Sequence, residues 1–305
     1  MLDLLKMMSG NNKRILLLGG TGMLGHTLFY YFSKKINYDV TATEINNKNI
    51  NKYFSPDISH RIITGVDVGN IRNINGIVEK IKPDIVVNCI GIIKQLKESR
   101  NPRIAIKINS LFPHELYEIC LSNKSRLIHV STDCVFSGKK GNYTEDDFAD
   151  ADDLYGRSKY LGEVKGGNAV TLRTSIIGHE LQGKLSLVEW FLSQNERVNG
   201  YVNAIYSGFP TIELARIIDE YVIPDTGLCG LYHVSSEPVS KYELLRMIAE
   251  IYNKKIDILP YDVFTENKSL DSTRFRERTG YIPPDWRTLV ERMHEWYQGN
   301  ISIYK

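Results

Sequence analysis

A tyrosine and a lysine stand four residues apart in the string Tyr155-Gly-Arg-Ser-Lys159. On a helix this spacing places both side chains on one face, one turn apart. A phenol is a weak acid–base catalyst near neutral pH, and a nearby ammonium group lowers its pKa. Tyr155 and Lys159 are therefore candidates for a general acid and its electrostatic partner, although a solvated helix face also carries this pattern by chance.

Hydroxyl groups precede this pair at the end of an expected buried strand, Arg126 to Val130. Ser131 and Thr132 follow that strand, and the polar stretch 138–153 is expected to be a loop over the site. A ketone held here would take a proton from Tyr155 and a hydrogen bond from Thr132, with Ser131 as the alternative donor. This chemistry fits carbonyl reduction by a nicotinamide cofactor whose ribose the lysine would bind.

A glycine-rich turn follows the first expected strand, Arg14-Ile-Leu-Leu-Leu18. A continuous apolar run of this length is typical of a strand buried on both faces. Glycines allow the backbone to approach a pyrophosphate closely, and the N-terminus of the following helix offers free N–H groups to it. This setting favours dinucleotide binding over a merely tight turn. The expected contacts are Gly19, Thr21, Gly22, Met23, Leu24 and Gly25.

The second expected strand, Tyr38 to Thr43, ends at Glu44. A carboxylate about 20 residues beyond the glycines accepts hydrogen bonds from the adenosine ribose and repels a 2′-phosphate. Glu44 therefore favours NADH over NADPH, while Lys48 would soften this preference. A surface glutamate at a strand end is the alternative, so NADPH and NADH both stay candidates.

Two later strand ends complete the expected cofactor site. The strand from Arg61 to Thr64 leads to an aspartate that either faces the adenine or serves a turn, and the strand from Asp84 to Ile90 ends at a glycine. A residue without a side chain there would let the nicotinamide half pass close to the backbone. The further expected contacts are Asp67, Val68, Cys89, Ile90 and Gly91.

The alternation of strands and helices predicts an α/β fold with a Rossmann-type doubly wound parallel sheet. Helices are expected at 70–82, from Pro102 onward with Leu111 on the apolar face, and at 211–222, and a sixth strand at 169–173. The Rossmann domain is predicted to comprise residues 13–174 plus about 206–224. About 175–205 plus 225–305 would form a smaller, discontinuous C-terminal α/β substrate lobe. Its expected elements are a helix at 187–194, a strand at 231–234, a helix at 241–252, a strand at 255–259 and a final helix after Pro284.

Composition narrows the class of protein. The 305 residues are 42% hydrophobic and 24% charged, as in ordinary globular proteins, and a net charge of +2 gives no reason to expect nucleic acid or a membrane as partner. No apolar run approaches the ~20 residues of a membrane span, and residues 1–12 lack the features of a signal peptide. The four cysteines are too widely spaced for a metal site, so we expect free thiols, no metal and a cytoplasmic protein. A homodimer is one option for its assembly.

Several motifs together carry a family resemblance. Gly19-x-x-Gly22-x-x-Gly25, Ser131-Thr-Asp-x-Val-Phe136 and Tyr155-x-x-x-Lys159 resemble those of the extended short-chain dehydrogenase/reductase superfamily. Within it the chain is most similar to the dTDP-4-dehydrorhamnose reductase group, also through Gly208-Phe-Pro-Thr211 and Gly230-Leu-Tyr-His233. The resemblance implies a catalytic triad of Thr132, Tyr155 and Lys159, cofactor contacts at the glycines and Glu44, and a nucleotide-sugar substrate.

Departures from the group point to a sister branch. Asn88-Cys-Ile-Gly91 replaces the group's alanine-rich string, and the arginine expected near position 268 or 269 is missing. Lys268 or Arg274 would then meet the diphosphate. The expected substrate contacts are Lys94, Asp133, Val135, Arg173, His179, Tyr206, Lys268 and Arg274.

The resemblance implies NAD(P)H-dependent reduction of the C4 ketone of a UDP- or dTDP-linked 4-keto-6-deoxyhexose, in deoxysugar or surface-glycan biosynthesis. UDP-2-acetamido-2,6-dideoxy-L-hexos-4-ulose is the favoured substrate. A nucleotide-sugar 4-epimerase is an alternative, and a dehydratase is less favoured because Asp133-Cys134 offers one acid where dehydratases carry an acid pair. A non-catalytic NAD(P)-binding regulatory subunit, like that of methionine adenosyltransferase, is a further alternative, against which the intact triad argues.

Overall fold

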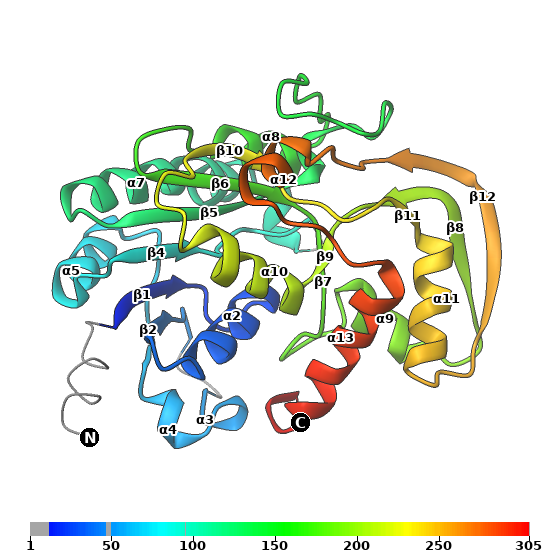
Figure 1. Cartoon of the computed structure of the whole chain (residues 1–305), viewed down its shortest axis with the longest axis horizontal. Helices are drawn as coiled ribbons and strands as arrows, with labels where there is room; N and C mark the ends of the chain where they lie inside the picture. The colour runs from blue at the N-terminus through cyan, green and yellow to red at the C-terminus, as the bar shows by residue number, and fades with distance from the viewer. Residues whose placement is uncertain (1–11, 47–49, 95, 305) are drawn as a thin grey trace.

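The computed structural model describes residues 12–46, 50–94 and 96–304 (Figure 1). The leader on which the signal-peptide prediction rests, up to residue 11, lies outside the described residues, and so does Lys48. None of the described helices is both long enough and apolar enough to cross a membrane. All four cysteines are free thiols, as expected.

A seven-stranded parallel sheet forms the centre of the molecule, in the order β10-β6-β5-β4-β1-β2-β3. The direction of winding reverses between β1 and β4, so the predicted doubly wound Rossmann-type sheet is confirmed. Ligands bind at the carboxyl ends of strands beside such a reversal. The strands are β1 Lys13–Leu18, β2 Tyr38–Thr43, β3 Ile62–Ile63, β4 Ile85–Asn88, β5 Arg126–Thr132, β6 Ala169–Thr174 and β10 Gly230–His233.

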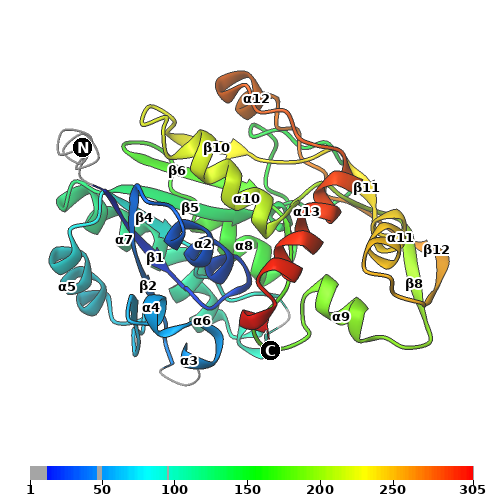
Figure 2. The same cartoon turned by 60° about the horizontal axis from the view of Figure 1, so that its bottom comes forward.

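Helices cover both faces of this sheet (Figures 1 and 2). Successive residues of β1 alternate between two cores: Ile15 and Leu17 pack in one, Leu16 and Leu18 in the other. This alternation explains why the strand is continuously apolar. Helices α2 and α10 contribute to the first core, and α5 and α7 to the second. Their bounds are α2 Met23–Ser33, α10 Thr211–Ile217, α5 Ile71–Ile81 and α7 Phe112–Ser122.

The helix expected from Pro102 is interrupted by a π-helical segment, Ile106–Leu111. Asn101 caps its start by accepting from the backbone N–H groups of residues 103 and 104. Leu111, predicted on the apolar face, is 51% exposed, and Phe112 is buried instead. The wider π turn shifts the apolar stripe relative to the spacing of a regular α-helix.

The remaining elements build the other half of the site and a second, smaller sheet. The sheet β11-β8-β12 carries α11 against it, and its long strand β8 was not predicted. The strand expected at 255–259 corresponds to β12, which begins two residues later, at Asp257, and extends to Asn267. Helix α12 was not predicted. The bounds are α8 Leu154–Leu161, β7 Ile176–Ile177, α9 Leu187–Ser193, β8 Arg197–Tyr206, β9 Phe209–Pro210, β11 Val239–Ser240, α11 Lys241–Ile251, β12 Asp257–Asn267, α12 Thr273–Thr279 and α13 Trp286–Gly299.

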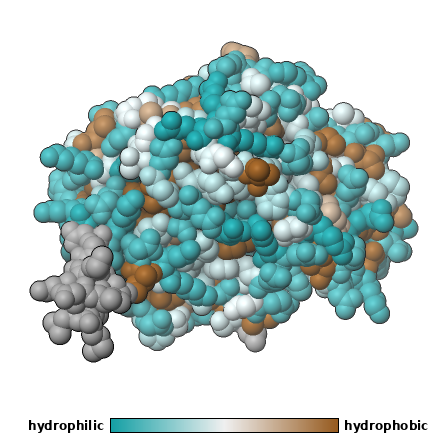
Figure 3. Space-filling view, in the orientation of Figure 1, coloured by the Kyte–Doolittle hydropathy of each residue, from teal (hydrophilic) through white to brown (hydrophobic). Residues whose placement is uncertain are grey.

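On the face shown in Figure 3, apolar residues are scattered among hydrophilic ones. Short helical segments connect the elements described above. The short segments are α3 Ile50–Tyr53, α4 Pro56–Ser59, η1 Lys97–Arg100, α6 Pro102–Ala105, η2 Ile106–Leu111, η3 Asp133–Val135, η4 Ile218–Val222 and η5 Ile301–Tyr304.

One strand belongs to a different part of the fold from the part predicted. The segment 231–234 was assigned to the substrate lobe, but β10 forms a parallel ladder with β6 in the main sheet, with His233 opposite Arg173. Without β10, the backbone N–H and C=O groups on the outer edge of β6 would be unpaired. Their hydrogen bonds to β10 explain why this segment joins the main sheet. The boundaries of the two predicted domains otherwise stay a prediction.

Candidate active site

The glycine turn between β1 and α2 is dictated by close backbone packing. Gly19 has a φ of 85°, and a Cβ on Gly25 would lie 1.9 Å from the Gly19 oxygen, so neither position accepts a side chain. A Cβ on Gly22 would meet only that same oxygen, at 3.5 Å. The space beside Gly22, at the N-terminus of α2, is therefore open and fits an incoming pyrophosphate. Leu24 is buried in the core, so a cofactor could contact only its backbone.

Glu44 stands directly across from this turn. Its carboxylate accepts a hydrogen bond from the Thr21 hydroxyl and another from the backbone of Asn46, at 3.1 Å. Burial raises the pKa of Glu44. The carboxylate thus lies beside the open end of the glycine turn. This is the position at which the sequence predicts binding of the adenosine ribose.

The expected adenine contacts lie in the turn after β3. The Asp67 Oδ1 accepts from the Gly69 backbone at 2.8 Å, so its own contact is that of a turn aspartate. Val68 is buried. The backbone N–H of Val66 donates to the main-chain carbonyl oxygen of Glu44 at 2.9 Å, which keeps this turn next to the glutamate. A role of Asp67 and Val68 in adenine binding stays a prediction.

Asn109, in the π-helical segment, connects the segment after β4 to α8, the helix that carries Tyr155 and Lys159. Its Oδ1 accepts from the Ile92 backbone at 2.8 Å, and its Nδ2 donates to the Ile92 oxygen at 3.2 Å and to the Ser158 Oγ at 3.1 Å. Sequence reasoning missed this residue. The available signal was an asparagine inside an expected amphipathic helix, where a polar residue usually points to solvent; here it is 1% exposed.

Lys159 extends from α8 toward the end of β4. Its Nζ donates to the Val130 oxygen at 2.9 Å, and a Cβ on Gly91 would lie 3.7 Å from this Nζ. Burial lowers the pKa of Lys159 to about 8. The ammonium group therefore faces the backbone between Cys89 and Gly91, where Cys89 donates its N–H to β1 and Ile90 is partly buried.

Thr132 and Tyr155 lie at the ends of neighbouring elements, β5 and α8. Thr132 Oγ1 donates to Asp133 Oδ1 at 3.2 Å and accepts from the Cys134 backbone at 3.1 Å. Asp153 caps α8 by accepting from Gly156 at 2.7 Å, which starts the helix just before Tyr155. Asp133 is buried, and burial raises its pKa.

Burial also raises the pKa of Tyr155 above its ordinary value, with a smaller opposite effect from the Thr132 hydroxyl. The prediction that Lys159 lowers this pKa is wrong for the net shift, because burial dominates it. Tyr155 is protonated at neutral pH, as it would be at its ordinary pKa of ~10, and burial makes it a weaker acid in the ligand-free protein.

Ser131 points away from Thr132, as successive side chains of a strand do. Its Oγ donates to Glu163 Oε1 at 2.9 Å, and both groups are buried. This contact engages the Ser131 hydroxyl in the core. Of the two candidate hydroxyls, the Thr132 hydroxyl is the one beside Asp133 and the tyrosine.

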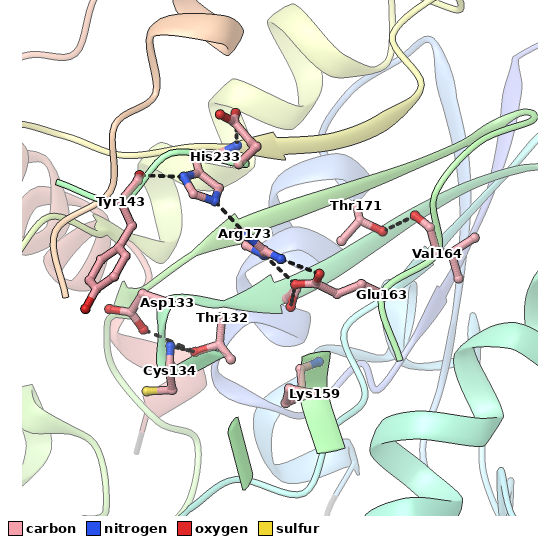
Figure 4. A network of polar contacts seen from close by, with 12 residues as sticks. Thr132, Asp133, Cys134, Tyr143, Lys159, Glu163, Val164, Thr171, Arg173 and His233 are labelled. Atoms are coloured by element: carbon pink, nitrogen blue, oxygen red, sulfur yellow. Dashed lines mark hydrogen bonds and ion pairs between the residues drawn. The ribbon is translucent and has the colours of Figure 1, made fainter. Parts of the chain in front are cut away.

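Arg173, a predicted substrate contact, is engaged in a buried polar network with Glu163 and His233 (Figure 4). Its side chain is 1% exposed and forms a bidentate ion pair with Glu163, at 2.6 and 2.7 Å. Its Nη1 donates to His233 Nε2 at 3.1 Å, and His233 Nδ1 donates to the Tyr143 oxygen at 2.9 Å. Burial and Arg173 lower the pKa of His233 to about 3, so the histidine is neutral. This buried network attaches the loop at Tyr143 to β6 and β10.

Two further predicted substrate contacts are core residues. His179 is 3% exposed because its ring nitrogens contact Glu189 Oε1 at 2.5 Å and the Tyr252 hydroxyl at 2.9 Å. Val135 has no exposed surface and packs in a small core with Phe136. Both side chains are consumed by packing between elements that are distant in sequence, so these two predictions are wrong.

The predicted cationic contacts differ in their surroundings. Lys268 Nζ pairs with Glu266 at 2.9 Å; burial opposes its charge, but Cys134, Glu266 and Asp133 raise the pKa of Lys268, so its ammonium group lies near Asp133. Lys94 is largely exposed and pairs with the helix cap Asp153 at 2.8 Å.

Arg274 pairs with Asp146 at 2.9 Å on the surface. Tyr206 is buried at the end of β8. Substrate binding by Lys94, Asp133, Tyr206, Lys268 and Arg274 stays a prediction.

Comparison with known proteins agrees with this geometry. The family model described as "RmlD substrate binding domain" matches residues 13–298. The dTDP-4-dehydrorhamnose reductase of Aggregatibacter actinomycetemcomitans is 24% identical, over 93% of this chain and 99% of that protein. Methionine adenosyltransferase 2 subunit beta of Danio rerio is 26% identical, over 79% of this chain and 74% of that protein.

Among solved structures, a dTDP-4-dehydrorhamnose reductase from Bacillus anthracis in complex with NADP has a TM-score of 0.75 at 22% identity, covering 93% of this chain and 99% of that one. The match to the family model spans the main sheet, the candidate catalytic residues and the small sheet together. The chain therefore belongs to the RmlD substrate binding domain family.

Proposed function

We propose that this protein reduces the C4 ketone of a nucleotide-linked 4-keto-6-deoxyhexose with NADH or NADPH. The observation that carries the proposal is that Thr132, at the carboxyl end of β5, lies beside Tyr155, with Lys159 one turn further along α8. Lys159 there faces Gly91, and the glycine turn lies open at Gly22. The similarity to a dTDP-4-dehydrorhamnose reductase along nearly the whole chain supports it.

Each residue of the triad has a distinct task. Tyr155, which is protonated at neutral pH, donates its proton to the carbonyl oxygen as negative charge develops there. The substrate oxygen replaces Asp133 as the acceptor of the Thr132 hydroxyl, so that the hydroxyl polarises the carbonyl. Lys159 holds the nicotinamide ribose near Gly91. A bound nicotinamide cofactor supplies the hydride.

The cofactor preference is proposed from Glu44. Its carboxylate, bonded to Thr21 at the mouth of the glycine turn, suits a ribose with free hydroxyls and disfavours a 2′-phosphate. NADH is therefore the proposed preference, although the Bacillus anthracis structure contains NADP. On the substrate side, Lys268 beside Asp133 supplies a cation for the diphosphate of a UDP- or dTDP-linked sugar. UDP-2-acetamido-2,6-dideoxy-L-hexos-4-ulose is the substrate to test first.

A non-catalytic NAD(P)-binding subunit is the second candidate, favoured by the similarity to methionine adenosyltransferase 2 subunit beta. The two functions make opposite predictions for turnover. A catalytic reductase needs the proton donor and the hydroxyl; a binding subunit needs only the cofactor cradle. Thr132, Tyr155 and Lys159 are all present and converge, which favours the reductase.

The test is oxidation of NADH and NADPH in the presence of dTDP-4-keto-6-deoxyglucose and of UDP-linked 4-keto sugars. We expect turnover with at least one substrate, and a fall of at least ~100-fold in kcat for Tyr155→Phe with cofactor affinity nearly unchanged. Tight NAD(P)H binding without turnover on any substrate would favour the binding subunit instead.

A further inference from the structure

Tyr206, the last residue of β8, carries a buried hydroxyl group without a hydrogen-bond partner among the described residues. Its side chain belongs to the core, and only 7% of the residue is exposed. Buried polar groups in native proteins are nearly always paired, because an unpaired one destabilises the fold. An unpaired phenol therefore requires a reason outside the stability of the chain.

The surroundings of the phenol explain why it stays unpaired. Gly208 leaves room for it: a Cβ there would lie 2.4 Å from the Tyr206 hydroxyl and 2.1 Å from the Ser175 oxygen. That carbonyl already accepts from the Phe209 N–H at 2.9 Å and from the Thr174 hydroxyl at 3.2 Å. Two donors thus already occupy this carbonyl oxygen. The Ser175 side chain lies close enough to oppose the rise in the pKa of Tyr206, but no hydrogen bond of good geometry joins it to the phenol.

The phenol lies at the same edge of the main sheet as the Thr132 hydroxyl. Thr174, which precedes Ser175, is the register partner of Thr132 in the ladder between β6 and β5. Neighbouring strands of a sheet lie about 4.8 Å apart, so the end of β6 brings Tyr206 to the same edge of the sheet as Thr132. Burial and the charge of Asp133 raise the pKa of Tyr206, so it remains a donor at neutral pH.

The small sheet presents a second side chain beside the phenol. Ile205 on β8 is paired with Asn267 on β12, so the next residues along the two parallel strands, Tyr206 and Lys268, follow that pair at the same end of the small sheet. Lys268 lies close to Asp133 as well. The small sheet thereby places a neutral donor and a cation opposite the strand that carries Thr132.

We propose that Tyr206 is a specificity-determining residue whose hydroxyl donates a hydrogen bond to an oxygen of the substrate's sugar. This inference rests on the proposed function, because it takes a nucleotide-linked sugar as the ligand. The bound sugar supplies the acceptor that the folded chain lacks. A sugar oxygen at this place satisfies the phenol, whereas an analogue without that oxygen leaves it buried and unpaired, which is how such sites discriminate.

The test is Tyr206→Phe, because phenylalanine keeps the ring packed against Trp286, whose centroid is 5.4 Å away. Tyr281→Phe is the matched control: Tyr281 is also buried, and its hydroxyl donates to Glu213 at 3.1 Å. We expect Tyr206→Phe to leave the melting temperature unchanged or raise it, and to raise KM for the 4-keto sugar about tenfold with KM for NAD(P)H unchanged. Tyr281→Phe should lower the melting temperature without changing KM.

A melting temperature of Tyr206→Phe that falls as far as that of Tyr281→Phe, with KM unchanged, would overturn the proposal, since the hydroxyl would then have a structural partner. If the wild-type protein oxidises no NAD(P)H, the proposed function fails, and calorimetry with UDP- and dTDP-linked sugars decides about Tyr206. Weaker binding by Tyr206→Phe than by wild type supports its role. Equal affinity, or no binding by either protein, contradicts it.

Discussion

Replacing Arg173 by methionine would leave the Glu163 carboxylate buried with no cation beside it. Both side chains are almost completely buried, at 1% and 0% exposure, and two short hydrogen bonds join them. Removing one partner of a buried ion pair typically destabilises a protein by about 3–5 kcal/mol, because the remaining charge stays desolvated. With about 2 °C of melting temperature per kcal/mol in a chain of this size, we expect a fall of roughly 6–10 °C.

A double variant separates the charge from the packing. Arg173→Met combined with Glu163→Leu removes both charges and keeps apolar volume in the space between β6 and the end of α8. The double variant should be more stable than Arg173→Met alone, since no unpaired charge remains. Ser131 and His233 would still lose a partner, so the recovery should be incomplete.

The assay is thermal unfolding together with steady-state kinetics well below the melting temperature of each variant. We expect KM of Arg173→Met for the sugar to stay within about threefold of wild type, because the buried guanidinium does not reach the substrate. An unchanged melting temperature combined with a KM raised about tenfold would refute the reasoning and restore Arg173 as a substrate contact.

Three further perturbations test the cofactor side of the site. Asn109→Ala removes hydrogen bonds to Ile92 and Ser158 and should lower kcat about tenfold, measured by NAD(P)H oxidation; an unchanged kcat would show that the link between β4 and α8 is dispensable. Glu44→Ala should narrow the preference for NADH, measured as the ratio of kcat/KM for the two cofactors, with an unaltered ratio counting against the assignment. Lys159 has a folded pKa lowered to about 8, so between there and about pH 10.4 this lysine binds more protons in the unfolded chain, and its own contribution to stability rises with pH. Burial raises the pKa of Cys89, Cys120 and Cys134 to about 12, so their contribution falls with pH in the same window. In urea unfolding, the free energy of unfolding of wild type should therefore rise relative to that of Lys159→Met across this window, and a constant difference would contradict the assignment.

The first half of the fold was predictable because its signals are local. The last four residues of β1, 15–18, are all apolar because the two faces of the strand contact two different cores, as is typical of a parallel strand covered on both faces. The glycine turn is equally local, since Gly25 has to be glycine to clear the Gly19 oxygen six residues earlier in the same turn. Thr132, Tyr155 and Lys159 could be picked because strand end, loop and helix follow one another directly.

The substrate side was predicted less well because its polar residues look alike in sequence. Arg173 follows a buried strand and lies near the binding edge, as a substrate contact would. What distinguishes it is Glu163 on one side and His233, far along the chain, on the other. A charged residue at a strand end carries no local mark of whether its partner is a ligand or a buried carboxylate. Only the packed structure decides between them.

Tyr206 combines one property that the sequence predicts, the burial of its ring, with one that it does not, the missing hydrogen-bond partner of its hydroxyl. Along β8 the buried positions Val198, Gly200 and Ala204 recur with a period of two, and Tyr206 continues that series. Recognising β8 as a strand would therefore have been enough to predict that the ring is buried. The missing partner of its hydroxyl could not have been predicted, because it depends on two donors that reach the Ser175 carbonyl from Thr174 and from the next short strand. A pattern of burial can come from sequence, but an unsatisfied donor is a property of the three-dimensional neighbourhood, and here it is that property which indicates a ligand.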